Sequence, residues 1–166
     1  MYQVYLSLGS NIEPEINLPR AIELLSEHGE LLKLSRAWES AAVGSDGPNF
    51  LNACALFLTP LSLPELKTQV IRPIEAKLGR IRTADKDAPR TIDIDAVLFD
   101  SQSCHDKFWK TAFVVIPLAE VNPQLQNPVT QESIIETATR LRQNVWMEVR
   151  PAVLNRFDDN YFRFQN

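Results

Sequence analysis

The segment TIDIDAVLF, at residues 91–99, decides the fold. Its apolar and polar residues alternate strictly at first, which is the pattern of a β-strand with one face buried. The residues that we expect to face the core are Ile92, Ile94, Ala96 and Leu98. The opposite face then carries Thr91, Asp93 and Asp95.

The acidic pair of this strand is the first candidate site. Carboxylates at positions i and i+2 of a strand lie roughly 7 Å apart at their Cβ atoms, and they repel each other. A cation beside them removes the conflict, and oxygen ligands suit Mg²⁺ together with phosphates and water. We therefore expect Asp93 and Asp95 to hold two magnesium ions. The alternative is a pair of ordinary surface acids on a half-solvated strand.

A basic segment precedes the strand and favours the metal interpretation. Residues 72–90 contain six basic and three acidic side chains, a balance of +3 in a chain whose net charge is −4. Arginine binds phosphate oxygens in bidentate fashion, so this composition suits a polyphosphate with its metal ions. The alternative is a solvated basic loop. The chain contains no GxxxxGK[ST] motif, which excludes a P-loop nucleotide site.

Working outward, periodicity and turn residues predict the remaining elements. They are a strand at 3–8, a helix at 15–27, strands at 31–39 and 50–58, and a helix from 62 to about 78 with a kink at Pro73. The order β-α-β-β-α-β matches an α+β, ferredoxin-like core. Additional C-terminal elements are expected as a short strand at 114–116, a helix at 132–142 and a strand at 143–150, and the tail 145–166 stays unassigned.

Composition limits the class of protein. A chain of 166 residues with 45% apolar and 23% charged residues suits one globular domain spanning 1–166. The net charge of −4 disfavours a nucleic-acid partner. Two scattered cysteines predict neither a disulfide framework nor a zinc site, and the apolar runs are too short to span a membrane. The apolar N-terminal stretch lacks the basic segment of a signal peptide, so we expect a cytoplasmic protein, with a monomer favoured.

Several segments together resemble the hydroxymethyldihydropterin pyrophosphokinase family. They are LSLGSN at 6–11, WESAAVG at 38–44, NFLNA at 49–53, IEAKLGRIR at 74–82, APRTIDIDAVLF at 88–99 and FVVIPLAEVNP at 113–123. The match spans roughly residues 2–125, and APRTIDID is the most specific signature. The resemblance implies a ferredoxin-like core that transfers pyrophosphate from ATP to 6-hydroxymethyl-7,8-dihydropterin, releasing AMP, in folate synthesis.

The resemblance also assigns residues to roles. It implies that Asp93 and Asp95 bind the two magnesium ions and that Arg80, Arg82 and Arg90 meet the ATP phosphates. Glu75 and His105 fall at nucleotide positions. The residues implied for the pterin are Ser40, Ala41, Val43, Phe50, Asn52 and Phe113, with Asn52 bonding the ring edge and the two phenylalanines enclosing its faces.

The chain also departs from the family pattern. Thr111 stands where an arginine is expected, with Lys110 as the candidate replacement cation, and Asp87 stands where the family has a tryptophan. The segment 100–110 is shortened. These departures leave open a pterin- or nucleotide-binding homologue with impaired catalysis. Two further alternatives are an enzyme acting on another alcohol and a plain ferredoxin-like interaction domain.

Overall fold

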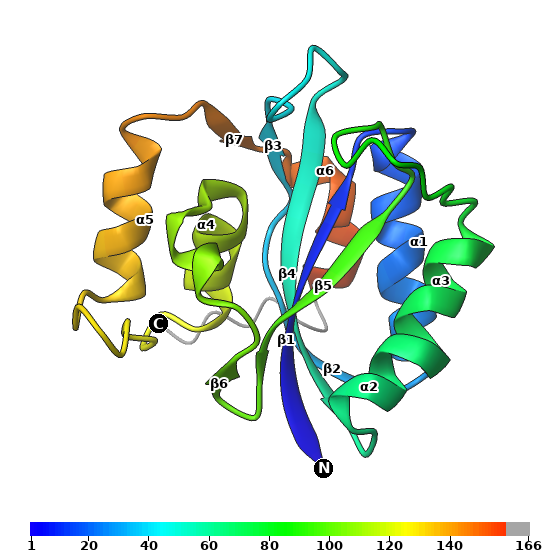
Figure 1. Ribbon diagram of the computed structural model, residues 1–166, viewed down its shortest axis with the longest axis horizontal. Coiled ribbons are helices and arrows are strands. Elements are labelled where there is room, and N and C mark those ends of the chain that lie inside the picture. Colours follow the sequence, from blue (N-terminus) through cyan, green and yellow to red (C-terminus); the bar gives the residue numbers. More distant parts are fainter. Residues whose placement is uncertain (159–166) are drawn as a thin grey trace.

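A twisted antiparallel sheet forms the centre of the computed structural model, which describes residues 1–158 (Figure 1). Within these residues the sheet has seven strands. Six of them follow the order β6-β5-β1-β4-β3-β7, and β2 pairs with the part of β4 that comes after the segment paired with β3. The strands are β1 (Tyr2–Ser10), β2 (Glu30–Leu34), β3 (Trp38–Ser40), β4 (Phe50–Thr59), β5 (Asp93–Phe99), β6 (Gln102–Ser103) and β7 (Met147–Val149).

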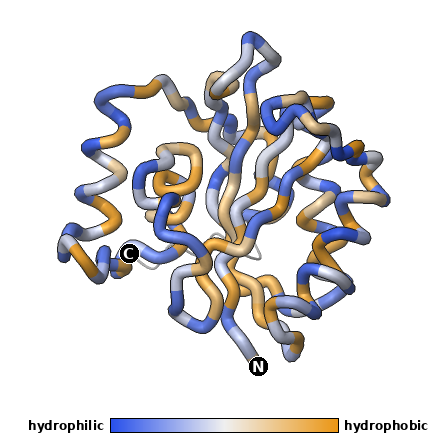
Figure 2. Tube along the Cα trace, viewed as in Figure 1, coloured by the Kyte–Doolittle hydropathy of each residue, from blue (hydrophilic) through white to orange (hydrophobic). Residues whose placement is uncertain are grey.

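Helices cover both faces of the sheet (Figure 1). The helical elements are α1 (Pro14–Ser26), α2 (Leu63–Leu66), the π-helical turn η1 (Lys67–Ile71), α3 (Arg72–Lys77), the 3₁₀ turn η2 (Asp106–Lys110), α4 (Ala112–Val121), α5 (Ile134–Arg142), α6 (Pro151–Leu154) and the 3₁₀ turn η3 (Asn155–Phe157). One apolar cluster joins the sheet to α1 and α3, and a second joins it to α4 and α5. Figure 2 shows the same division, with apolar residues along the central strands and in α4.

The predicted α+β, ferredoxin-like core is confirmed. In chain order it runs β1, α1, β2–β3, β4, α2–α3 and β5, with β1 paired to both β4 and β5. The helix after β4 begins as predicted, because the Glu65 carboxylate accepts from the Ser62 N–H at 2.9 Å. The predicted kink before Pro73 is a π-helical turn, in which the Arg72 N–H donates to the Lys67 carbonyl five residues earlier.

Several expectations about individual segments were wrong. The stretch 114–116 is helical, within α4, because a short apolar run buried on all sides has no periodicity that separates strand from helix. The predicted strand 31–39 is broken into β2 and β3. The strand expected at 3–8 is longer, because β1 continues through Gly9 and Ser10.

Strand β5 carries the two aspartates with the expected alternation at its start. Ile92, Ile94 and Ala96 pack in the cluster with α1 and α3. The pairing of β5 with β1 then shifts, leaving Val97 as an extra residue, and Leu98 joins Val97 in the cluster with α4. Leu98 is buried as expected, but on the α4 side and not with Ile92, Ile94 and Ala96, because one bulge residue reverses the faces of the strand beyond it.

Candidate active site

A cavity of about 340 Å³ opens where β1 and β3 end and β4 and β5 begin, beside the start of α4. Its size is that of a small-molecule site. The lining residues are Ser7, Gly9, Ser40, Ala41, Val43, Phe50, Asn52, Lys86, Asp87, Arg90, Asp93, Asp95, Val97, His105, Phe108, Thr111, Phe113 and Val114. All six residues predicted to contact the ring are among them, together with both aspartates.

The apolar wall lies on the face of the sheet that packs against α4. Phe50 begins β4, and Phe113 lies in the first turn of α4. Two residues that are far apart in the sequence therefore line the same cavity. Gly9 leaves the floor open between them, because a Cβ there would lie 3.7 Å from Phe50 Cδ1 and 3.4 Å from Asn52 Oδ1. A flat aromatic ring fits such a slot, with its faces toward the phenylalanines.

The Asn52 side chain is 3% exposed at the back of this cavity. Its Nδ2 donates to the Trp38 carbonyl at 3.2 Å and to Ser40 Oγ at 2.8 Å. Because β3 and β4 pair with Trp38 opposite Asn52 and Ser40 opposite Phe50, the sheet itself sets this geometry. A buried amide in a small-molecule site provides a polar contact of fixed position.

The acidic wall lies on β5. Asp93 and Asp95 both line the cavity, as the strand alternation predicts. Two arginines bind Asp93: Arg80 donates to Oδ1 at 2.6 Å, and Arg90 donates to Oδ2 at 3.0 Å. The carboxylates and the arginines predicted from the sequence are thus brought together at one end of β5.

Asp95 differs sharply from its neighbour. Among residues 1–158, no side chain or backbone group forms a hydrogen bond or an ion pair with its carboxylate. Desolvation inside the cleft raises the pKa of Asp95, and the negative charge of Asp93 raises it further, while His105, Arg80 and Lys67 oppose the increase. Asp95 is exposed, so its carboxylate is open to solvent or to a ligand in the cleft.

Glu75, on α3, holds two of the arginines in place by accepting their hydrogen bonds. It is 3% exposed on α3, and its Oε1 accepts from Arg80 at 2.6 Å and from the Ile94 N–H at 3.0 Å. Its Oε2 accepts from Arg82 at 2.8 Å. Burial alone would lower the pKa of Arg80, but the carboxylates of Asp93 and Glu75 outweigh burial and raise it. Glu75 therefore connects the basic loop to β5 but lines neither cavity.

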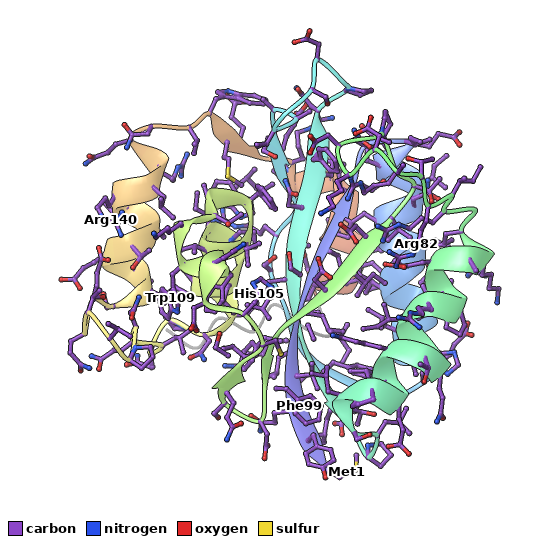
Figure 3. All side chains as sticks on the ribbon, in the orientation of Figure 1. Met1, Arg82, Phe99, His105, Trp109 and Arg140 are labelled. Atoms are coloured by element: carbon purple, nitrogen blue, oxygen red, sulfur yellow. The ribbon has the colours of Figure 1, made fainter. Side chains whose placement is uncertain are left out.

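A second hollow of about 190 Å³ lies within the loop 80–90. Arg80, Arg82 and Arg90 line it together with Lys86, so four of the cations expected near phosphates surround one space. Figure 3 shows Arg82 on the side of α3 and His105 toward α4. His105 lines the larger cavity, whereas Lys110 is exposed at the end of η2 and lines neither.

The sequence reasoning missed Asn11, which it placed in an ordinary turn. Asn11 is 3% exposed, and its Oδ1 accepts from the Arg90 N–H at 2.8 Å. Its Nδ2 donates to the Pro48 carbonyl at 3.3 Å, so it joins the loop 41–49 to the root of the loop 80–90. Asp87 and Thr111, noted only as departures, line the cavity. No local sequence pattern predicts a contact between segments that lie this far apart in the chain.

The residues present fit magnesium in company with phosphates. Among the described residues, no group of three or more His, Cys, Asp or Glu side chains is arranged to hold a metal unaided. Magnesium in phosphoryl-transfer sites usually takes only one or two carboxylates, with water and phosphate oxygens completing its shell. The unpaired Asp95 beside Asp93 is such a donor set.

Sequence comparison finds several relatives. Three of them are named 2-amino-4-hydroxy-6-hydroxymethyldihydropteridine pyrophosphokinase. The Synechocystis protein is 35% identical over 79% of this chain and 72% of its own length. The Aquifex aeolicus protein is 35% identical over 82% of this chain and 90% of its own. The Bacillus subtilis protein is 32% identical over 82% and 88%.

Solved structures agree on the fold. A Plasmodium falciparum HPPK-DHPS with SDX-DHP superposes with a TM-score of 0.63 at 13% identity, covering 98% of this chain and 45% of that one. An HPPK-DHPS in complex with substrates gives a TM-score of 0.62 at 11% identity, covering 97% and 45%. In the residues described, no helix has the length and hydropathy needed to cross a membrane. The family model of 7,8-dihydro-6-hydroxymethylpterin-pyrophosphokinase (HPPK) matches residues 5–123, and the chain belongs to this family.

Proposed function

We propose that this chain transfers the β,γ-pyrophosphoryl group of ATP to the hydroxymethyl group of 6-hydroxymethyl-7,8-dihydropterin and releases AMP. One observation carries the proposal. A ring-sized cavity with an amide at its back and a paired set of aspartates and arginines share the same cleft. The names of the relatives support the same reaction.

The cavity suits the pterin, which receives the pyrophosphoryl group. We propose that Phe50 and Phe113 enclose the faces of the pterin and that Asn52 bonds its edge. Ser40, Ala41 and Val43 would provide backbone contacts along one side. This places the hydroxymethyl group toward β5, where the aspartates lie. Holding the hydroxyl near the phosphate converts a bimolecular step into one within a complex.

The basic loop suits ATP, which donates the pyrophosphoryl group. We propose that Arg80, Arg82 and Arg90 bind the ATP phosphates, with His105 at the nucleotide side. Lys110, exposed at the end of η2 and outside both cavities, would reach the nucleotide from solvent. The hydroxyl oxygen of the pterin then bonds to the β-phosphorus and gives its proton to water. The bond from the β-phosphorus to the α-phosphate oxygen breaks, its electron pair stays on that oxygen, and AMP leaves. Arginines aimed at the phosphates stabilise the charge that develops on the oxygens, and such positioning supplies most of the catalysis of phosphoryl transfer.

Asp93 and Asp95 would hold two magnesium ions, which neutralise and orient the phosphates when bound. Asp93 is engaged by Arg80 and Arg90 in this structure, so metal binding implies that the two arginines turn toward the phosphates. The loop 80–90 that carries them is well suited to such a change, because its residues are largely exposed.

The test is product analysis with ATP, Mg²⁺ and the dihydropterin. We expect AMP and the pterin pyrophosphate in equal amounts, and loss of both products in Asp95→Asn. Formation of ADP, or turnover without magnesium, would contradict the proposal. A pteridine- and nucleotide-binding protein without transfer is the second candidate, because Thr111 and Asp87 occupy positions where the resemblance expects arginine and tryptophan. Binding of both ligands without AMP release would favour it.

A further inference from the structure

Part of the segment that follows residue 123 lies beside the loop 41–49, although the family model does not match it. Strand β7 pairs with all three residues of β3, the strand from which this loop begins. Figure 1 shows β7 alongside β3, next to the loop that joins β3 to β4. Arg150 follows β7 directly, and its N–H donates to the Ala37 carbonyl at 2.9 Å. The backbone therefore fixes Arg150 close to β3.

The Arg150 side chain is bonded to both ends of the loop 41–49 through one carboxylate. Its Nη1 donates to Glu39 Oε2 at 2.6 Å, and Asn49 Nδ2 donates to Glu39 Oε1 at 3.2 Å. Hydrogen bonds from Arg150 and from Asn49 lower the pKa of Glu39. At neutral pH the carboxylate is thus ionised and accepts from both neighbours. We refer to these three residues as the Arg150–Glu39–Asn49 clamp.

The clamp joins the residues that immediately precede two residues of the cavity wall. Glu39 precedes Ser40, and Asn49 precedes Phe50; Ser40 and Phe50 both line the cavity and pair with each other across β3 and β4. Successive side chains of a strand point to opposite faces of the sheet, so Glu39 points away from the cavity that Ser40 lines. The clamp therefore restrains the loop without taking up space in the cavity.

The loop has a conformational freedom that such a restraint would reduce. Ala41 and Val43 line the cavity from within it, and Gly44 and Gly47 follow them. Any freedom that the loop keeps in the ligand-free chain must be lost when a ligand contacts these residues, and that loss weakens binding. A bond between the two ends of a loop removes part of this freedom in advance.

We propose that Arg150 is a positioning residue for the pterin, because it holds Glu39 and Asn49 together and so keeps the loop 41–49 in the conformation that the ligand requires. The proposal rests on the proposed function, since it assumes a pterin in this cavity. It gives a part in substrate binding to a segment that the family model does not match. Among residues 1–158, the ion-pair partners of Arg150 are Glu39 and Glu15, neither of which lies in the loop 80–90. The effect should therefore concern the pterin much more than ATP.

The test compares five forms of the full chain. They are the unmodified chain, Arg150→Met, Arg150→Lys, Asn49→Ala and the control Arg140→Met. Arg140 is a matched control, because it also follows residue 123 and forms a surface ion pair, with Glu132 at 2.8 Å, but lines neither cavity. Calorimetry measures the Kd of a non-hydrolysable ATP analogue with Mg²⁺, and then the Kd of 6-hydroxymethyl-7,8-dihydropterin. Amide hydrogen exchange measures the opening of residues 41–49 in the ligand-free chain.

We expect the Kd of the dihydropterin to rise roughly three- to tenfold in Arg150→Met and in Asn49→Ala, the effect of about one hydrogen bond. The Kd of the ATP analogue should stay within about twofold of its unmodified value. Exchange in residues 41–49 should become faster in both variants. Arg150→Lys keeps one charged donor and should recover most of the pterin affinity, whereas Arg140→Met should change neither affinity nor exchange in this loop.

An unchanged dihydropterin Kd in Arg150→Met would overturn this inference. Equal weakening of both ligands would overturn it as well, because it would indicate a general loss of structure and not a restraint on one loop. Failure of the unmodified chain to bind the dihydropterin would overturn the proposed function. In that case the exchange rates of residues 41–49 would still show whether the clamp restrains the loop, so the two failures are distinguishable.

Discussion

Replacing Glu75 by glutamine removes one charge from the buried network under the site. Glu75 accepts from Arg80 at 2.6 Å, from Arg82 at 2.8 Å and from the Ile94 N–H at 3.0 Å. The glutamine keeps one carbonyl oxygen but directs an NH₂ group at arginine donors. The Arg80 side chain is only 11% exposed, so water cannot replace the lost partner fully.

The size of the effect follows from burial. Breaking a buried ion pair by removing one partner costs about 3–5 kcal/mol, and the retained bond to Ile94 places Glu75→Gln near the low end, at ~3 kcal/mol. The Arg82 contact adds little, because that side chain is 65% exposed. In a chain of this size the loss corresponds to a decrease in Tm of ~6–12 °C.

The same substitution should affect catalysis. Arg80 would no longer be held toward the phosphates, so we expect kcat to fall by ~10- to 100-fold, the range of one hydrogen bond to a charged group. Glu132→Gln is the control, since Glu132 meets Arg140 at 2.8 Å on the surface, where solvent screens the pair and its contribution to stability is small. Thermal denaturation and AMP release measure the two effects. Equal Tm values for the two variants would refute the reasoning.

Three further predictions concern charge and space. Asp95→Asn should raise the Tm of the ligand-free chain slightly while abolishing AMP release, because it removes one of two neighbouring negative charges; a lowered Tm would contradict this. The hydrogen bond from Arg150 lowers the pKa of Glu39 below its ordinary value of 4.5. The stability that this pair provides is therefore present above pH 4.5 and is lost as the pH falls through the lowered pKa. The Tm difference between the unmodified chain and Glu39→Gln should shrink over that acidic range, and a constant difference would exclude the contribution. Gly9→Ala should weaken pterin binding by ~10-fold or more with little change in Tm, because its Cβ would enter the cavity 3.4 Å from Asn52 Oδ1, and unchanged affinity in calorimetry would count against that placement.

The core of the fold was predictable because strong local patterns coincide with it. The alternation around Asp93, the capping box at Ser62 and the turn residues at 44–48 all act over a few positions. Segment 114–116 was not predictable in the same way, because an apolar run packed on all sides shows no preferred period. The bulge at Val97 depends on pairing with β1 and leaves no mark in the strand itself.

The site followed a similar division. The sequence identified the residues on each wall, since acids, arginines and aromatics are conspicuous by type and by their resemblance to a family. It did not reveal how they are connected. The bonds of Asn11 to Pro48 and Arg90 join residues 37 and 79 positions away, and only the folded chain brings them together.

The most direct test of the account is a calorimetric titration of the chain with a non-hydrolysable ATP analogue, with and without Mg²⁺. If Asp93 and Asp95 hold the metal ions against the phosphates, binding will depend on Mg²⁺ in the unmodified chain and that dependence will disappear in Asp95→Asn. The same affinity with and without Mg²⁺, or an Asp95→Asn variant that keeps the full magnesium effect, would contradict it.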